Sequence, residues 1–157
     1  MKKLYTLALA SALVGGAFIG GLALGKGATD AKFITNDEVK FDDMGGLKLG
    51  VLTGDAKKGP YGGILKLPAG FTSPLHTHTG DYEAVMISGT TSHWFKGEDG
   101  TKAKKLTPGS YWKIPGGVPH ISSCAAGAEC VLYIWQTKPF DAQMIDDKGK
   151  VIPPAKK

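Results

Sequence analysis

Three of the four histidines in this chain stand at spacings that suit metal binding. His76 and His78 are separated by one residue, and side chains at positions i and i+2 of a strand lie on the same face. Glu83 opens an apolar segment a short turn later, where an unpaired carboxylate would cost free energy. His120 follows the Pro/Gly-rich segment 115–119. Three neutral imidazoles and one carboxylate suit one divalent transition metal: Fe, Mn, Ni, Cu or Zn.

The remaining candidates for chemistry are weaker. His93 lies beside Trp94 and Phe95, and its position predicts a surface or rim residue that is neither a ligand nor a base. The chain contains no Gly-x-Ser-x-Gly elbow, no phosphate-binding P-loop, no dinucleotide fingerprint and no Cys-x-x-Cys pair, so those reaction classes find no support. The sequence identifies no catalytic residue beyond the metal ligands.

Short strands must position these residues. After residue 31 the chain reads as six short apolar or alternating runs separated by Gly/Pro turns, which is typical of an all-β sandwich or barrel. In the run that Glu83 opens, Val85 and Ile87 share its face, and we expect that face to point inward. The six predicted strands cover residues 47–52, 61–67, 83–88, 92–96, 110–114 and 130–135.

The histidine clusters resemble the two sequence motifs of the cupin superfamily. The segment Gly70-x5-His76-x-His78-x4-Glu83-x5-Gly89 is similar to the first cupin motif. The segment Gly109-x5-Pro115-x-Gly117-x2-His120 is similar to the second. The second half also resembles the cupin domains of ChrR-type anti-sigma factors and exported relatives. The resemblance implies a small double-stranded β-helix, or jelly-roll, barrel holding the metal inside one end. It also implies that the ligands are His76, His78, Glu83 and His120.

Two positions depart from the cupin pattern. Five residues separate Glu83 from Gly89, whereas the family pattern has six. Cys124 stands where the second motif usually ends in Asn. Neither departure touches a histidine ligand, but the second makes any analogy of substrate less safe.

The chain divides into three parts. Residues 1–31 combine Lys2 and Lys3 with a long uncharged run and then small residues, which indicates a signal peptide or an uncleaved N-terminal membrane anchor. Either outcome places the remaining chain outside the cytoplasm, most plainly in the periplasm. Residues 32–137 form the predicted cupin barrel. Residues 138–157 are a polar tail that we expect to pack loosely.

The two cysteines, Cys124 and Cys130, flank a short loop. In an oxidising compartment they are placed to bridge the two strands that this loop joins. The alternative is that they are two small buried apolar residues.

Composition restricts the partners. The formal net charge is +5, yet every cation is lysine and the chain has no arginine, whereas nucleic-acid binding normally uses the arginine fork. We therefore expect a small-molecule ligand and no nucleic acid. Contact with a membrane is expected only if the N-terminal segment is uncleaved. By analogy with other cupins, a homodimer through sheet edges is a further expectation.

Three functions fit these observations. The first is a metal-dependent enzyme, of dioxygenase or isomerase type, acting on a small organic molecule. Aromatic residues near the metal would favour a phenolic or enolic substrate, and Glu83 could leave the metal to act as a base. The second is a non-catalytic zinc- or ligand-binding sensor. The third is a structural or carbohydrate-binding barrel that holds no metal.

Overall fold

The computed structural model describes residues 31–146 and 148–153. The chain separates into two compact units, residues 1–33 and residues 34–157, and the second contains every strand described below. Nearly all of the predicted export segment therefore lies outside the described residues. Within the described part of the chain, no helix has the length and apolar character needed to cross a membrane.

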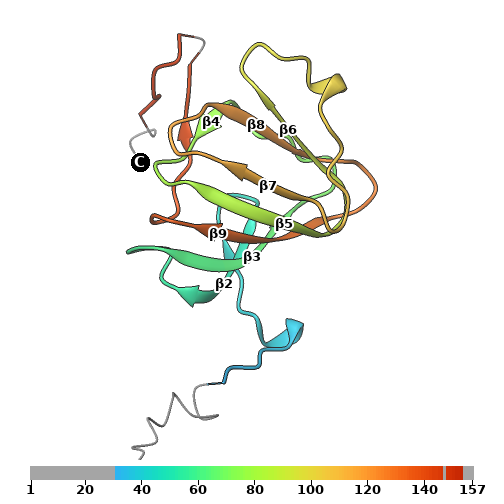
Figure 1. Ribbon diagram of the computed structural model, residues 1–157, viewed down its shortest axis with the longest axis vertical. Helices are drawn as coiled ribbons and strands as arrows, with labels where there is room; N and C mark the ends of the chain where they lie inside the picture. The colour runs from blue at the N-terminus through green and yellow to red at the C-terminus, as the bar shows by residue number, and fades with distance from the viewer. Residues whose placement is uncertain (1–30, 147, 154–157) are drawn as a thin grey trace, which may run out of the picture. The chain divides into compact units, whose positions relative to one another are not determined.

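Two antiparallel sheets form the second unit (Figure 1). The six-stranded sheet has the order β1-β2-β3-β9-β5-β7, with β1 at Asp42–Asp43, β2 at Lys48–Gly54, β3 at Tyr61–Leu67, β9 at Cys130–Gln136, β5 at Tyr82–Ser88 and β7 at Tyr111–Ile114. The four-stranded sheet has the order β10-β4-β8-β6, with β10 at Gln143–Met144, β4 at His76–Thr77, β8 at His120–Cys124 and β6 at Thr91–Phe95. This architecture confirms the predicted all-β cupin barrel. Two short 3-10 turns, η2 at Asn36–Glu38 and η3 at Gly100–Lys102, complete the described elements.

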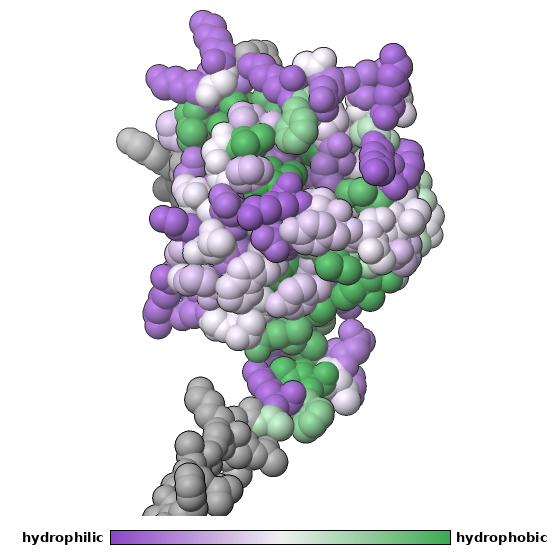
Figure 2. Space-filling model, viewed as in Figure 1, coloured by the Kyte–Doolittle hydropathy of each residue, from purple (hydrophilic) through white to green (hydrophobic). Residues whose placement is uncertain are grey.

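The core lies on the inner face of the large sheet. Alternate residues of β9 are buried, with Cys130, Leu132 and Ile134 at most 4% exposed. These side chains pack with buried residues of β3 and β5 in one apolar cluster, and this alternation is the period that one buried face imposes on a strand. On the outer face, Figure 2 shows hydrophobic residues exposed among hydrophilic ones; the exposed apolar side chains of this sheet include Val85, Ile87, Tyr111 and Trp135.

The six predicted strands are present, each within two residues of its predicted ends. Sequence periodicity did not predict β1 or β10, because two residues are too few to show an alternation. The strand expected to begin at His120 is β8, and it pairs with β6 along its whole length.

The C-terminal segment is more ordered than expected. Residues 34–157 belong to one compact unit, and β10 pairs with β4, placing Gln143 opposite Thr77 and Met144 opposite His76. Upstream of β10, the Phe140 amide donates to the Ala56 carbonyl at 2.8 Å. The expectation of a loose tail was wrong for this segment, because a polar composition conceals the backbone pairing that holds it in place.

The two cysteines form a disulfide. Cys124 ends β8 and Cys130 begins β9, and their Cα atoms lie 5.8 Å apart. The bridge therefore joins the small sheet to the large one at the end of the barrel away from His120.

Candidate metal centre

Three histidines converge inside the barrel. His76 lies in β4, His78 follows that strand, and His120 begins β8 directly opposite His76. Their potential ligand atoms all lie within 4.8 Å of one another, a separation at which the three can hold a metal ion. His76 is 6% exposed and His120 is completely buried. The structure therefore brings together all three histidines that the sequence singled out.

Each of these rings is oriented by a backbone carbonyl. The Nδ1 atom of His76 lies 2.9 Å from the Pro74 oxygen, and that of His120 lies 3.0 Å from the Val118 oxygen. The His78 Nδ1 atom contacts the Asp141 carbonyl oxygen. A carbonyl oxygen only accepts hydrogen bonds, so each Nδ1 carries the hydrogen and each Nε2 is unprotonated. This is the tautomer that a metal ligand needs.

Burial keeps the three rings neutral. It lowers the pKa of His76 and of His78, although their carbonyl contacts act in the opposite direction. Burial and the neighbouring histidines lower the pKa of His120 to about 3. A neutral imidazole is the form that ligates a divalent cation, so the donor set fits such an ion at neutral pH.

Turns on either side hold the histidine strands in register. The Gly117 amide donates to the His78 carbonyl at 2.8 Å, and Gly117 itself has a φ of 79°, which an L side chain rarely adopts. The Asp81 carboxylate accepts from the Gly116 amide at 2.9 Å. The two cupin-like motifs are thus joined by backbone contacts as well as by the histidines.

Glu83 does not lie with the histidines. Its carboxylate lies 3.3 Å from the Lys113 ammonium on the neighbouring strand, and both side chains are more than two-fifths exposed. Val85 and Ile87, on the same face, are 40% and 49% exposed, so the expectation that this face points inward was wrong. Both faces of this strand carry apolar residues, so hydrophobicity alone does not show which face points inward. The ion pair between Glu83 and Lys113 marks the face of Glu83 as the outer one.

Tyr82 takes the inward position instead. It is 4% exposed, and its hydroxyl lies 3.3 Å from the His120 Nε2 atom. Burial raises the pKa of Tyr82, and the nearby Trp112 and Ser122 side chains oppose that effect. Sequence reasoning missed this residue, although six residues separate Tyr82 from Gly89, as in the family pattern. The five-residue gap after Glu83 was the signal that could have found it.

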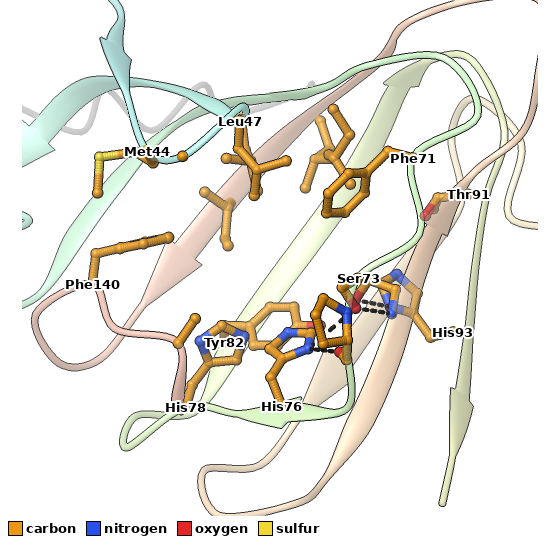
Figure 3. A pocket seen from close by; sticks show the side chains of 18 of the residues that line it. Met44, Leu47, Phe71, Ser73, His76, His78, Tyr82, Thr91, His93 and Phe140 are labelled. Atoms are coloured by element: carbon orange, nitrogen blue, oxygen red, sulfur yellow. Dashed lines mark hydrogen bonds between the residues drawn. The ribbon is translucent and has the colours of Figure 1, made fainter. Parts of the chain in front are cut away.

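A cavity of about 220 Å³ opens beside the histidines. Among the described residues, no aspartate, glutamate or lysine lines it. Figure 3 shows a polar side and an apolar side. The labelled residues of the polar side are Ser73, His76, His78, Tyr82 and His93, and those facing them are Met44, Leu47, Phe71 and Phe140.

Two distant parts of the chain supply much of the apolar side. Met44 and Leu47 come from the connection between β1 and β2, and Phe140 and Met144 come from the C-terminal segment. The segment predicted to be loose therefore contributes both the cavity wall and the carbonyl that orients His78.

A jelly-roll barrel with inward-facing histidines on and beside two paired strands, β4 and β8, defines a cupin-type protein. Residues 28–146 match a family described as a domain of unknown function (DUF4437). The chain belongs to this family. No curated protein sequence matches the chain.

Solved structures show the same fold. An RmlC-like cupin from Shewanella frigidimarina is 20% identical, with a TM-score of 0.55 over 70% of this chain and 92% of its own. An acetylacetone dioxygenase from Acinetobacter johnsonii is 18% identical, with a TM-score of 0.57 over 98% and 90%. The Rhodobacter sphaeroides complex of SigE with the anti-sigma ChrR matches at 16% identity, with a TM-score of 0.51 over 65% and 50%. These TM-scores support the shared fold, including the expected resemblance to ChrR.

Proposed function

We propose that this protein is an exported, metal-dependent enzyme, of dioxygenase or isomerase type, that acts on a small organic molecule. One observation carries the proposal: three neutral histidines converge, and two of them, His76 and His78, line a cavity suited to a small molecule. A bound Fe, Mn, Ni, Cu or Zn ion would supply Lewis-acid or redox chemistry. Three protein ligands leave coordination positions open, as in catalytic rather than structural sites.

The chain's own residues have distinct roles in this proposal. His76, His78 and His120 would hold the ion, and the carbonyls of residues 74, 118 and 141 would fix their orientation. The apolar side of the cavity would exclude water from a bound substrate. The solved structure described as an acetylacetone dioxygenase supports the reaction type, because it aligns with 98% of this chain.

A zinc- or ligand-binding sensor is the second candidate. The similarity to the ChrR complex favours it, and the same three histidines would then hold zinc without turnover. The large apolar cavity beside the histidines favours the enzyme, since a purely structural zinc site needs no room for a substrate.

Export is proposed on two observations. The first is the N-terminal segment with its two lysines and its long uncharged run. The second is the Cys124–Cys130 disulfide, because such bonds persist mainly in oxidising compartments such as the periplasm.

Metal analysis tests the proposed function. The untagged protein is purified from the periplasm without chelator, beside a His76→Ala/His120→Ala variant. About one iron, manganese, nickel or copper per chain, absent from the variant, supports the enzyme and directs a substrate screen. Stoichiometric zinc without turnover supports the sensor. Absence of metal from both proteins, with both folded, overturns the metal site.

A further inference from the structure

His93 is half-buried and forms part of the cavity wall. It lies in β6, paired with Ser122 of β8, and its ring centroid is 6.3 Å from that of His120. Its Nδ1 atom lies 3.0 Å from the Ser122 hydroxyl. The sequence predicted a surface or rim position, and the half-buried ring lies on the side of β6 that turns toward the histidine cluster (Figure 3).

Two buried polar atoms meet on this wall without protein partners. The Nε2 atom of His93 and the Nε1 atom of Trp112 are fully buried and make no hydrogen bond of normal geometry with the described residues, although the Trp112 side chain lies near enough to the Tyr82 hydroxyl to oppose the rise in its pKa. The two rings lie 5.0 Å apart between centroids, tilted by 38°, and both line the cavity. Buried polar groups in native proteins are almost always hydrogen-bonded, so two adjacent exceptions indicate a missing partner.

The chemistry of that partner follows from the two atoms. An indole N–H only donates, so the atom facing Trp112 must accept a hydrogen bond. No aspartate, glutamate or lysine of the described residues lines the cavity, so an anion would find no counter-charge there. A hydroxyl or carbonyl oxygen meets both requirements.

The rest of the cavity determines the body of the ligand. Leu65, Phe71, Ile134 and Phe140 are among the apolar residues that line it, and no charged side chain of the described residues reaches it. An engineered cavity of about 150 Å³ accommodates benzene. A cavity of about 220 Å³ therefore suits a somewhat larger molecule, of about ten non-hydrogen atoms.

We propose that His93 and Trp112 form an oxygen-binding corner that selects uncharged, mainly apolar molecules of about ten non-hydrogen atoms carrying a hydroxyl or carbonyl group. This inference rests on the proposed function, in that the molecule would be the substrate. The inference also gives the orientation of the bound substrate. Its oxygen lies at the corner formed by His93 and Trp112, near the histidine cluster, and its hydrocarbon part extends toward Phe71 and Phe140.

Three probes of similar size test the selection. Calorimetric titration of the metal-free, chelator-treated protein compares 4-ethylphenol, 4-ethyltoluene and 4-methylbenzoate. The hydroxyl compound is expected to bind at least tenfold more tightly than the hydrocarbon, and the carboxylate is expected to show no measurable binding. Equal binding of phenol and hydrocarbon, preference for the carboxylate, or no binding of any probe overturns the proposal.

Conservative variants locate the selection. In Trp112→Phe and His93→Phe the phenol's advantage over the hydrocarbon should fall to about twofold or less, whereas Trp94→Phe, outside this cavity, should keep it. Persistence of the advantage in both corner variants, with circular dichroism showing native folds, contradicts the assignment. Because the protein contains no metal in this assay, a failure of the proposed metal chemistry would leave the binding result standing.

Discussion

The orientation of three imidazole rings determines what this site can bind. Pro74, Val118 and Asp141 each present a carbonyl to one Nδ1 atom, so the three Nε2 lone pairs are available together. Side chains that hold ligands in this way commonly affect metal affinity 10–100-fold when lost. Here backbone carbonyl oxygens orient the rings. A single side-chain substitution therefore cannot remove one of these hydrogen-bond acceptors without moving the backbone.

Metal content should depend on the histidines and not on Glu83. Glu83→Gln is expected to retain full metal stoichiometry, because its carboxylate faces Lys113 on the outer surface. His120→Ala should lose most of the metal, because it removes one of three converging donors. Elemental analysis of both variants, purified side by side, measures the difference. Equal loss of metal in the two variants would return Glu83 to the ligand set.

The stability of the metal-free protein should fall in acid. The pKa of His93 is about 4 in the folded protein and 6.5 as its ordinary value, so the unfolded chain binds more protons between these pH values. Stability is therefore complete above pH 6.5 and is lost as the pH falls toward 4. His93 contributes on the order of 3 kcal/mol to this loss.

Urea titrations at pH 7 and pH 5 measure this dependence. His93→Phe should show a smaller loss of unfolding free energy than the wild type, while Trp94→Phe should match the wild type. A pH dependence unchanged in His93→Phe would show that the buried ring does not carry it.

At the scale of elements, long strands were predictable and short ones were not. The strand Cys130–Gln136 is long enough for its apolar run to reveal it, whereas β4 and β10, two residues each, form only because neighbouring segments pair with them. The face of β5 was mispredicted because both faces carry apolar residues. Convergence of His76, His78 and His120 was predictable from spacing, but the roles of Tyr82 and Trp112 depended on the register between strands.

The disulfide should stabilise the barrel without affecting the metal. Five residues lie between its cysteines, and closing so short a loop in the unfolded chain is worth about 2 kcal/mol. Cys124→Ser/Cys130→Ser should lose about that much unfolding free energy. Metal content should not change, because Cys124 stands four residue steps along β8 from His120, a distance of about 13 Å. Loss of metal from the folded variant would contradict this independence.

The C-terminal segment should strengthen metal binding. A chain ending at Thr137 lacks the Asp141 carbonyl and β10, so its metal affinity should fall about 10–100-fold. A chain ending at Pro153 keeps both and serves as the control. Competition with a chelator measures affinity, and circular dichroism verifies the fold. Unchanged affinity in a folded chain ending at Thr137 would show that His78 needs no such support.

At the scale of the whole molecule, the barrel presents a lysine-rich, arginine-free surface and encloses an uncharged cavity. The sequence predicted the barrel because two motifs and regular turns occur in order. It could not predict the shape of the cavity, since residues near 44 and near 140 meet only in three dimensions. The homodimer stays a prediction, which size-exclusion chromatography with light scattering would test.

Export should be detectable in the location and the mass of the protein and in the oxidation state of its cysteines. Cell fractionation with intact-mass analysis is expected to find either a periplasmic protein lacking about the first 31 residues or a membrane-bound full-length chain, as the segment's lysines and apolar run indicate. In both cases thiol labelling under denaturing conditions should detect no free cysteine. A full-length chain in the cytoplasm with two free thiols would contradict the prediction.

The pairing of β10 with β4 has a consequence for when the metal can enter. His78 is oriented only after the chain has been made as far as Asp141 and Met144 has come to lie opposite His76. A nascent chain therefore lacks the carbonyl that orients His78 until synthesis is nearly finished. We therefore expect metal loading to be a late event, so that the ion acquired is decided by the metals present in the compartment where folding is completed, rather than by those surrounding the ribosome.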